Sequence, residues 1–214
     1  MSGVSVILLA AGESRRMGPL NKMTLPVAGV ALLRRIASTL VNSEVGEVVA
    51  VLGHEEQTAR GLLADLPLRL VTNERYRDGQ MTSVHCGLEA LSEPCKGIMV
   101  CLSDQPLLCV DDIDRLVRAF EHQCPGSVLI PAWQGRRGNP VILGYEHRDA
   151  ILAGGPGLGC RRYIDAHPQL VVWQEMDNDH VVFDLDTPED YQRLLRRLGC
   201  GAVGTGAAGA AAGR

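Results

Sequence analysis

A run of small and cationic residues directly follows the first apolar segment of this chain, and it is the clearest candidate for chemistry. The run is Leu9-Ala10-Ala11-Gly12-Glu13-Ser14-Arg15-Arg16-Met17-Gly18-Pro19-Leu20-Asn21-Lys22. Small residues let backbone N–H groups approach an anion closely, and Arg16 and Lys22 supply positive charge, so the run predicts a phosphate-binding loop. Its spacing fits neither the P-loop nor the G-x-G-x-x-G motif, and a solvent-facing loop is the alternative interpretation.

Lys22 is notable because the chain has only two lysines, Lys22 and Lys96, beside nineteen arginines. Lysine is therefore not the ordinary surface cation of this protein. A lysine retained within the phosphate-binding loop favours a chemical role, although a single residue can also stand there by chance.

Two aspartates follow apolar segments later in the chain and could hold a metal ion. Asp104 lies in Leu102-Ser103-Asp104-Gln105-Pro106, and Asp186 lies in Asp184-Leu185-Asp186-Thr187-Pro188. Mg²⁺ prefers hard oxygen ligands and is commonly held by one or two carboxylates together with substrate phosphates. Each aspartate alone fits a turn or a helix cap equally well. Their combination with a phosphate loop favours the metal site.

The elements that must position these residues alternate along the chain. Apolar segments predict strands at residues 4–9, 48–52, 68–72, 97–102, 128–131, 139–143 and 170–174. Helical spacing predicts helices at residues 32–40, 55–63, 82–91, 113–120, 145–152 and 188–198. The alternation predicts an α/β fold: a three-layer, mostly parallel Rossmann-like sheet with helices on both faces and a small β-hairpin insertion near residues 128–143. In such a sheet, ligands bind beyond the carboxyl ends of the strands.

Length, charge and composition limit the function classes. The 214 residues favour one domain over residues 1–198, followed by a Gly/Ala-rich tail over residues 199–214 that we expect to be disordered. A formal net charge of −4 argues against a nucleic-acid partner. The apolar runs are too short for a membrane helix, and neither a signal peptide nor a closely spaced cysteine pair is evident, so we expect a cytoplasmic protein. Cys86 and Cys101 are expected to be core residues rather than nucleophiles.

The phosphate-loop string resembles a known nucleotide-binding signature. Leu-Ala-Ala-Gly-x-Ser-x-Arg-Met-Gly followed by Asn-Lys is similar to that of the molybdopterin nucleotidyltransferase family, and most similar to its cytidylyl-transferring branch. Four further segments carry the resemblance to about residue 198. One is Leu102-Ser103-Asp104-Gln105-Pro106, which resembles the family's Asp-x-Pro element. The other three are Asn73-Glu74 with Gly79-Gln80-Met81-Thr82-Ser83, then Gly138-Asn139-Pro140-Val141, and finally Asp184 to Tyr191.

The resemblance implies a nucleotide-diphospho-sugar transferase-like fold and a role for each matching residue. It implies catalytic roles for Arg16, Lys22 and Asp104, and a Mg²⁺ or Mn²⁺ site at Asp104 and Asp186. The implied nucleotide-binding residues are Leu9, Ala10, Ala11, Gly12, Ser14, Arg15, Met17, Gly18, Asn73, Gly79, Gln80 and Ser83. The implied acceptor side is Gly138, Asn139 and Pro140. One departure from the family pattern lies at residues 154–161, where a usual aspartate is missing.

The implied reaction is transfer of CMP from CTP to the phosphate of molybdenum cofactor, with release of pyrophosphate and a molybdoenzyme of the xanthine dehydrogenase type as client. Guanylyl-transferring relatives have glycine where this chain has Ala11, whose methyl group narrows the space beside the base and favours CTP. Four alternatives stay open: GTP as donor, another phosphorylated acceptor, an oxidoreductase that binds a nicotinamide cofactor, and a non-catalytic cofactor carrier.

Overall fold

Buried aliphatic residues make the central strands of the sheet. The computed structural model of the chain describes residues 3–18, 21–92, 94–154 and 160–199, and of Arg15 the backbone alone. All seven residues of β1 (Val4–Ala10) are buried, because the strand is covered on both faces and paired on both edges. Its neighbours are β4 (Val48–Leu52) and β6 (Gly97–Leu102), both parallel to it. Apart from Gly199, the predicted tail lies outside the described residues.

The sheet order is β10-β7-β9-β6-β1-β4-β5. The outer strands are β5 (Arg69–Thr72), β7 (Val128–Trp133), β9 (Val141–Gly144) and β10 (Val171–Glu175), and the short β8 (Arg136–Arg137) pairs with β7. Within this sheet, as far as the structure describes it, only β8 and β9 run antiparallel to their partners. The predicted mostly parallel sheet is confirmed, and the predicted hairpin residues join this sheet. A separate two-stranded sheet of β2 (Pro26–Val27) and β3 (Val30–Ala31) was not predicted.

The direction of β9 matters for the site. Because β9 is antiparallel to β6, Val141 at its start lies opposite Val100, near the end of β6. Residues that precede β9 therefore reach the same edge of the sheet as residues that follow β1 and β6. This places the 138–140 segment near the end of β1, although the two are far apart in sequence.

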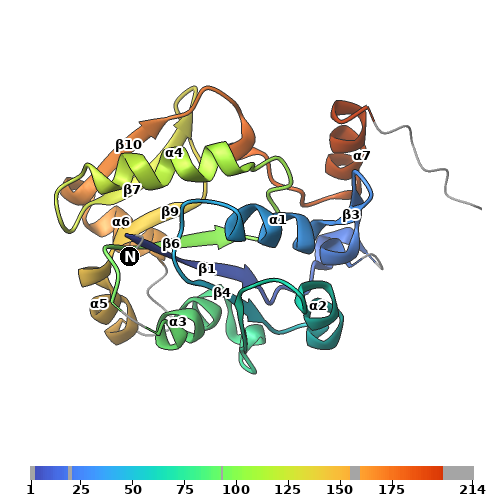
Figure 1. Ribbon diagram of the computed structural model, residues 1–214, viewed down its shortest axis with the longest axis horizontal. Coiled ribbons are helices and arrows are strands. Elements are labelled where there is room, and N and C mark those ends of the chain that lie inside the picture. The colour runs from blue at the N-terminus through green and yellow to red at the C-terminus, as the bar shows by residue number, and fades with distance from the viewer. Residues whose placement is uncertain (1–2, 19–20, 93, 155–159, 200–214) are drawn as a thin grey trace, which may run out of the picture.

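Helices cover both faces of the sheet, as Figure 1 shows. Val6 and Leu8 of β1 face one apolar core, and Ile7 and Leu9 face the other, because successive side chains of a strand point to opposite faces. The first core takes side chains from α1 (Leu32–Val41), α2 (Glu56–Leu63), α4 (Val110–Glu121) and α7 (Pro188–Arg197). The second takes them from α3 (Gln80–Ala90), α5 (Arg148–Ala153) and α6 (Cys160–Ala166). Of these helices, α6 was not predicted.

Among the described residues, no helix is long and apolar enough to cross a membrane.

The last helix, α7, begins as its sequence predicts. Thr187 caps α7 by accepting a hydrogen bond from the backbone N–H of Asp190 at 3.2 Å, and Pro188 occupies the first turn, where a missing N–H costs nothing.

Candidate active site

A cleft of about 730 Å³ opens at the carboxyl ends of β1 and β6. It brings together segments from six parts of the chain, and its walls are both cationic and acidic. The lining residues are Leu9, Ala11, Gly12, Ser14, Arg16, Lys22, Met23, Tyr76, Gln80, Ser83, Leu102, Ser103, Asp104, Arg161, Asp184 and Asp186. A charged cleft at this edge of a parallel sheet is where a ligand is expected to bind.

The loop after β1 forms the floor of the cleft. Ala11 is 6% exposed, and a Cβ on Gly12 would meet no atom within 4 Å, so space opens directly above the glycine. A 3₁₀ turn at Arg15–Met17 follows, and the buried side chain of Met17 anchors it in the core. Small residues at the floor and an anchored turn behind them leave backbone N–H groups accessible to a ligand anion.

Lys22 is the cation that the fold holds most firmly in the cleft. It starts a second 3₁₀ turn, Lys22–Thr24, which is capped by the Asn21 side chain and anchored by buried Met23. Lys22 Nζ lies 3.1 Å from Asp104 Oδ2 and 3.2 Å from Asp186 Oδ1, and only 13% of its side chain is exposed. The ammonium group thus bridges the two carboxylates that the sequence predicts as metal ligands.

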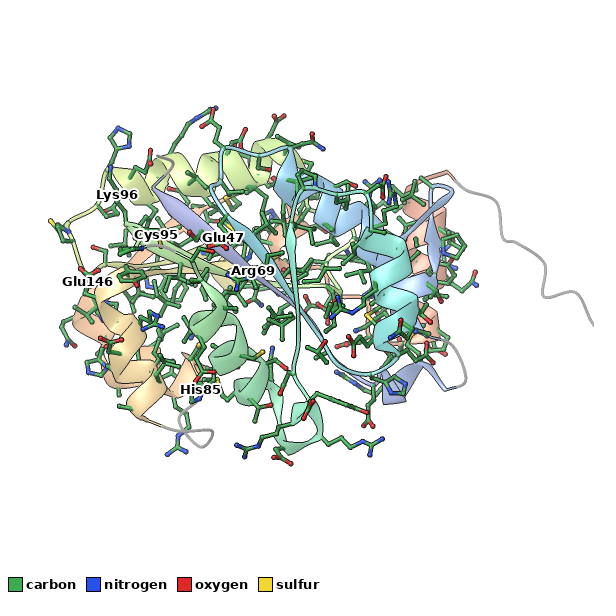
Figure 2. All side chains as sticks on the ribbon, turned by 60° about the horizontal axis from the view of Figure 1, so that its bottom comes forward. Glu47, Arg69, His85, Cys95, Lys96 and Glu146 are labelled. Atoms are coloured by element: carbon green, nitrogen blue, oxygen red, sulfur yellow. The ribbon has the colours of Figure 1, made fainter. Side chains whose placement is uncertain are left out.

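Arg16 adds a second, more exposed positive charge. Its guanidinium lies 3.1 Å from Asp186 Oδ2, but 72% of its side chain is exposed. An exposed pair of this kind contributes little to stability, so Arg16 remains available to a ligand. The other lysine, Lys96, lies at the opposite end of the sheet beside Cys95 and Glu146, as Figure 2 shows, and takes no part in the cleft.

The acidic wall is assembled from two separate segments. The backbone N–H of Leu185 donates to the carbonyl of Asp104 at 2.8 Å, which fixes the segment that carries Asp186 against the end of β6. Gln105 Nε2 donates to the carbonyl of Val181 at 3.0 Å and is a second contact between the same two segments. These backbone contacts hold the carboxylates of Asp104 and Asp186 together around one ammonium group.

The oxygens of this wall suit a divalent cation. Asp104 Oδ1 is buried and, within the described part of the chain, has no hydrogen-bond partner. A buried carboxylate oxygen without a donor is costly unless a ligand completes it, and two neighbouring carboxylates are the ligands that Mg²⁺ and Mn²⁺ prefer. The residues present therefore fit the predicted metal ion.

Asp184 is a third carboxylate in the cleft, and sequence reasoning gave it no role. Desolvation by the surrounding protein, together with the charges of Asp104 and Asp186, raises the pKa of Asp184 to about 6. Its position could have been foreseen, because residues two apart on an extended segment point to the same side. The cleft therefore concentrates negative charge, which favours the binding of cations.

The first turn of α3 forms the opposite wall. The helix follows Gly79, whose φ of +117° is accessible to glycine and strained for other residues, and it presents Gln80 and Ser83 to the cleft. The N-terminal N–H groups of a helix carry partial positive charge and suit a phosphate or a polar base edge. Tyr76 and Arg161 also line the cleft, and neither was predicted.

Asn73 occupies a different position from the one its predicted role requires. It is 6% exposed, and its amide nitrogen donates to Thr82 Oγ1 at 2.8 Å and Ser83 Oγ at 2.9 Å. Its amide oxygen accepts the backbone N–H of Arg75. Asn73 does not line the cleft and instead ties the end of β5 to the start of α3.

The remaining predicted residues divide into three groups. Gly138 and Asn139 line an adjoining cavity of about 460 Å³, which shares Leu9, Gln80, Leu102, Arg161 and Asp184 with the cleft. Ala10, Met17, Gly18, Gly79 and Pro140 lie near the cleft without lining it, and the side chain of Arg15 lies outside the described structure. Residues 155–159, where the family pattern is broken, are also outside it.

Two buried cysteines of the described chain, Cys101 and Cys160, are unsuited to act as nucleophiles. Burial raises the pKa of Cys101 to about 12 and that of Cys160 to about 11, so both thiols stay protonated near neutral pH. Because the thiolate is the reactive form, neither cysteine is activated. The expectation that Cys101 is a core residue agrees with its complete burial.

The chain is similar in sequence to proteins of more than one named activity. The family model described as a MobA-like NTP transferase domain matches residues 6–170. A nicotine blue oxidoreductase of Paenarthrobacter nicotinovorans is 32% identical over 200 residues, covering 90% of this chain and 96% of that protein. A molybdenum cofactor guanylyltransferase of Mesorhizobium japonicum is 32% identical over 205 residues, covering 91% of this chain and 96% of that protein.

Solved structures share the fold at lower identity. A crystal structure from Mycobacterium tuberculosis H37Rv has a TM-score of 0.80 at 21% identity and covers 91% of this chain and 98% of that chain. The same protein in complex with manganese has a TM-score of 0.74 at 19% identity, with coverage of 91% and 98%. The predicted fold class is confirmed by these likenesses.

Proposed function

Because the chain belongs to the MobA-like NTP transferase family, we propose that it transfers CMP from CTP to the phosphate of molybdenum cofactor and releases pyrophosphate. The observation that carries the proposal is the bridge of Lys22 between Asp104 and Asp186, at 3.1 and 3.2 Å, beside an open glycine loop. This arrangement offers cations and metal ligands at one place, as nucleotidyl transfer requires. We further propose that residues 1–198 carry this activity as one domain.

The work of the side chains in this reaction is positioning and charge neutralisation. The acceptor phosphate attacks the α-phosphorus of the nucleotide, and pyrophosphate leaves, so no covalent intermediate with the protein is needed. Lys22 and Arg16 neutralise the triphosphate oxygens, and Gly12 and Ser14 leave room for them at the floor of the cleft. Gln80 and Ser83 of α3 face the nucleotide from the other side. A preorganised donor of this kind is typically worth about 3–4 kcal/mol of barrier.

A Mg²⁺ or Mn²⁺ ion held by Asp104 and Asp186 supplies further positive charge to the phosphate oxygens when bound. The unpartnered Asp104 Oδ1 supports this assignment. Lys22 lies between the two carboxylates and holds them together.

The preference for CTP rests on Ala11, which lines the cleft. Its methyl group is packed against the loop at Gly53, where an added Cβ would come within 2.8 Å of it. We propose that this methyl group narrows the space beside the base and so favours a pyrimidine. Because one relative is named a guanylyltransferase, GTP is the nucleotide to compare.

Thermal shift with CTP or GTP, each with Mg²⁺, tests the donor. At 100 times its dissociation constant, a ligand stabilises the fold by about 2.7 kcal/mol, so the preferred nucleotide gives the larger shift. We expect that nucleotide to be CTP, and stabilisation confined to GTP would reverse the assignment. The matched variant Ala11→Gly is expected to gain affinity for GTP.

Incubation of the protein with CTP, Mg²⁺ and molybdenum cofactor tests the reaction itself. We expect pyrophosphate and a cytosine dinucleotide form of the cofactor. Absence of pyrophosphate with every donor would contradict the proposal. The expected recipient of this product is a cytoplasmic molybdoenzyme of the xanthine dehydrogenase type. Adding the product to the apo form of that enzyme is expected to restore its activity.

A second candidate is an oxidoreductase that binds a nicotinamide cofactor in the same cleft. The similarity to a protein named nicotine blue oxidoreductase favours it. The Asp104–Lys22–Asp186 arrangement favours nucleotidyl transfer instead, because hydride transfer requires no pair of metal-binding carboxylates. Stabilisation by NADPH but by no nucleoside triphosphate would favour the oxidoreductase.

A further inference from the structure

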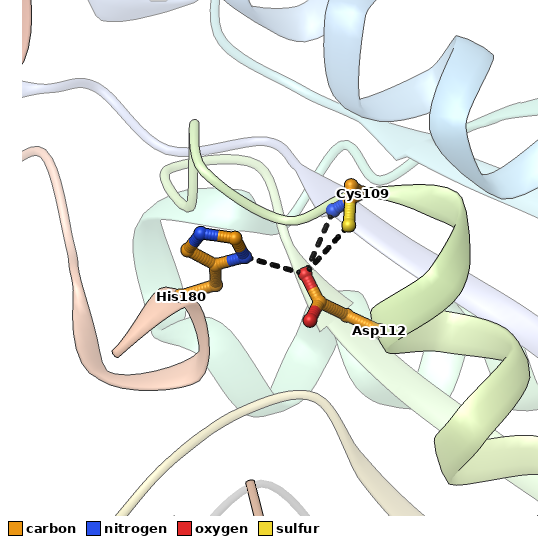
Figure 3. A group of neighbouring side chains, drawn as sticks. All are labelled: Cys109, Asp112 and His180. Carbon is orange, nitrogen blue, oxygen red and sulfur yellow. Dashed lines mark hydrogen bonds and ion pairs between the residues drawn. The ribbon is translucent and has the colours of Figure 1, made fainter. Parts of the chain in front are cut away.

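A second cluster of chemically active side chains lies outside the cleft. Cys109, at the N-cap of α4, and Asp112, in its first turn, meet His180 of a 3₁₀ turn at His180–Val182, as Figure 3 shows. One potential ligand atom from each residue lies within 4.8 Å of the other two. The cluster therefore joins a helix start to a segment that is distant in sequence.

The three ligand atoms converge on one point. Asp112 Oδ2 lies 3.1 Å from Cys109 Sγ and 2.7 Å from His180 Nδ1. Zinc bonds of roughly 2.3 Å to sulfur and about 2.0–2.2 Å to nitrogen and oxygen place tetrahedral ligands about 3.3–3.5 Å apart. Asp112 Oδ2 would therefore have to move away from Cys109 Sγ and His180 Nδ1 by only about half an ångström to admit a zinc-sized ion.

The surroundings of the cluster are already arranged for a ligand carboxylate. The Asp112 side chain is 4% exposed, and its other oxygen, Oδ1, accepts a hydrogen bond from Asn178 Nδ2 at 2.9 Å. The backbone N–H of Cys109 donates to Asp112 Oδ2 at 3.0 Å. Hydrogen bonds of this kind orient metal-binding carboxylates, and they stay in place when an ion replaces the thiol and imidazole protons.

Access and charge also fit a cation. The His180 side chain is 24% exposed, so one side of the cluster is open to solvent. Asp111 adds negative charge in the same first turn of α4. The neighbouring Asp179 is held by both terminal nitrogens of Arg197, at 2.7 and 2.6 Å, and is therefore already paired.

We propose that Cys109, Asp112 and His180 form a zinc site, separate from the carboxylate site of the cleft. The mixed sulfur, nitrogen and oxygen ligands suit Zn²⁺, whereas Mg²⁺ prefers oxygen alone. The bound ion ties the 178–182 segment to α4. That segment leads to the acidic wall, because the carbonyl of Val181 accepts hydrogen bonds from Gln105 Nε2 at 3.0 Å and from the Asn139 N–H at 2.9 Å.

Titration of the full chain with Co²⁺ in excess Mg²⁺ tests the site, because Mg²⁺ occupies the carboxylates of the cleft and cobalt reports its ligands by absorption. We expect a thiolate-to-cobalt charge-transfer band that saturates at one ion per chain. Zn²⁺ alone should displace the cobalt and abolish the band. Cys109→Ser should lose the band, and Cys124→Ser, which removes an exposed thiol, should keep it.

Two further variants complete the test. Asn178→Ala leaves all three ligands in place and should weaken Zn²⁺ binding by about 10–100-fold. His180→Gln reports on the site if Cys109→Ser does not fold. A cobalt band that is absent in the wild type, or that persists in Cys109→Ser or His180→Gln, would show that the cluster is a hydrogen-bonded helix cap only. Nucleotidyl transfer is measured separately, so failure of one proposal does not decide the other.

Discussion

Asp186 and Asp190 stand four residues apart, yet the protein surrounds their carboxylates very differently. The oxygens of Asp186 face the long side chains of Lys22 and Arg16 across the cleft. Asp190 Oδ2 accepts hydrogen bonds from the Asp186 N–H at 3.1 Å, the Thr187 N–H at 2.9 Å and Thr187 Oγ1 at 2.9 Å. One carboxylate meets cations from distant loops, and the other closes the first turn of its own helix.

This contrast separates a binding group from a structural one. Backbone and capping donors saturate Asp190, so a ligand has nothing to complete there. The cleft retains an unsatisfied oxygen in Asp104, and its cations belong to side chains that can turn toward a ligand. Substitutions in the cleft should therefore reduce activity with little loss of stability, and substitutions around Asp190 should do the reverse.

The largest effect is expected from Lys22→Ala and from Asp104→Asn. Each removes one side of the bridge that neutralises charge during the reaction, so turnover should fall by about 100-fold or more, or roughly 2.7 kcal/mol of barrier. Pyrophosphate release measures this effect. Circular dichroism should show a retained fold, and Lys96→Ala, at the other end of the sheet, should keep wild-type turnover. Near-wild-type turnover in either cleft variant would contradict the assignment.

Asp190→Ala should destabilise the protein by about 1–3 kcal/mol, because it removes a charged acceptor and leaves partly buried N–H groups without a partner. Urea denaturation measures the free energy of unfolding. Turnover should fall less than in Asp104→Asn. Equal stability of the variant and the wild type would show that the capping contacts contribute nothing.

Thr187→Ala should lower the free energy of unfolding by about 1 kcal/mol, because the N-cap oxygen that accepts the Asp190 N–H is lost. The same denaturation experiment applies. Thr187→Ser keeps the hydroxyl and serves as the matched control. If the serine variant loses as much stability as the alanine variant, the cost comes from packing and not from capping.

Arg193→Ala should have the smallest effect and lower the free energy of unfolding by at most about 1 kcal/mol. Its guanidinium pairs with Asp190 Oδ1 at 2.7 Å and lies over the ring of Phe183, but 61% of its side chain is exposed, and exposed pairs contribute little. The effect should shrink at high salt, because salt screens exposed charges. If Arg193→Ala lowered the free energy of unfolding more than Asp190→Ala does, the expected order of these variants would be wrong.

The fold was predictable where periodicity is long and continuous. The buried run of β1 and the helical spacing of α1 are local signals, and both predictions are confirmed. The two-residue strands β2 and β3 carry no periodicity, and α6 follows a glycine-rich segment that hides its start. These elements form through contacts with the rest of the fold and leave little trace in local sequence.

The candidate site was predictable as a set of segments and less so as individual side chains. The sequence identified the loops that contain Lys22 and Asp104, because strand ends converge at one edge. It did not show that Asn73 turns inward to bind α3, since a polar residue after a strand can serve a ligand or the protein itself. Asp184 was missed although its position two residues before Asp186 was a usable signal. Tyr76 was missed because nothing in the sequence alone says that it faces the cleft.

The bridge formed by Lys22 also gives a physical reason for a lysine at this position in a chain rich in arginine. Two carboxylates at 3.1 and 3.2 Å share one compact ammonium group, whose rotating N–H bonds can serve both. A guanidinium is planar and wider, with its donors in a fixed fork, so it would pair with one carboxylate and push the other away. Retention of the positive charge at this position is therefore not sufficient, and the shape of the cation sets the spacing of the acidic wall.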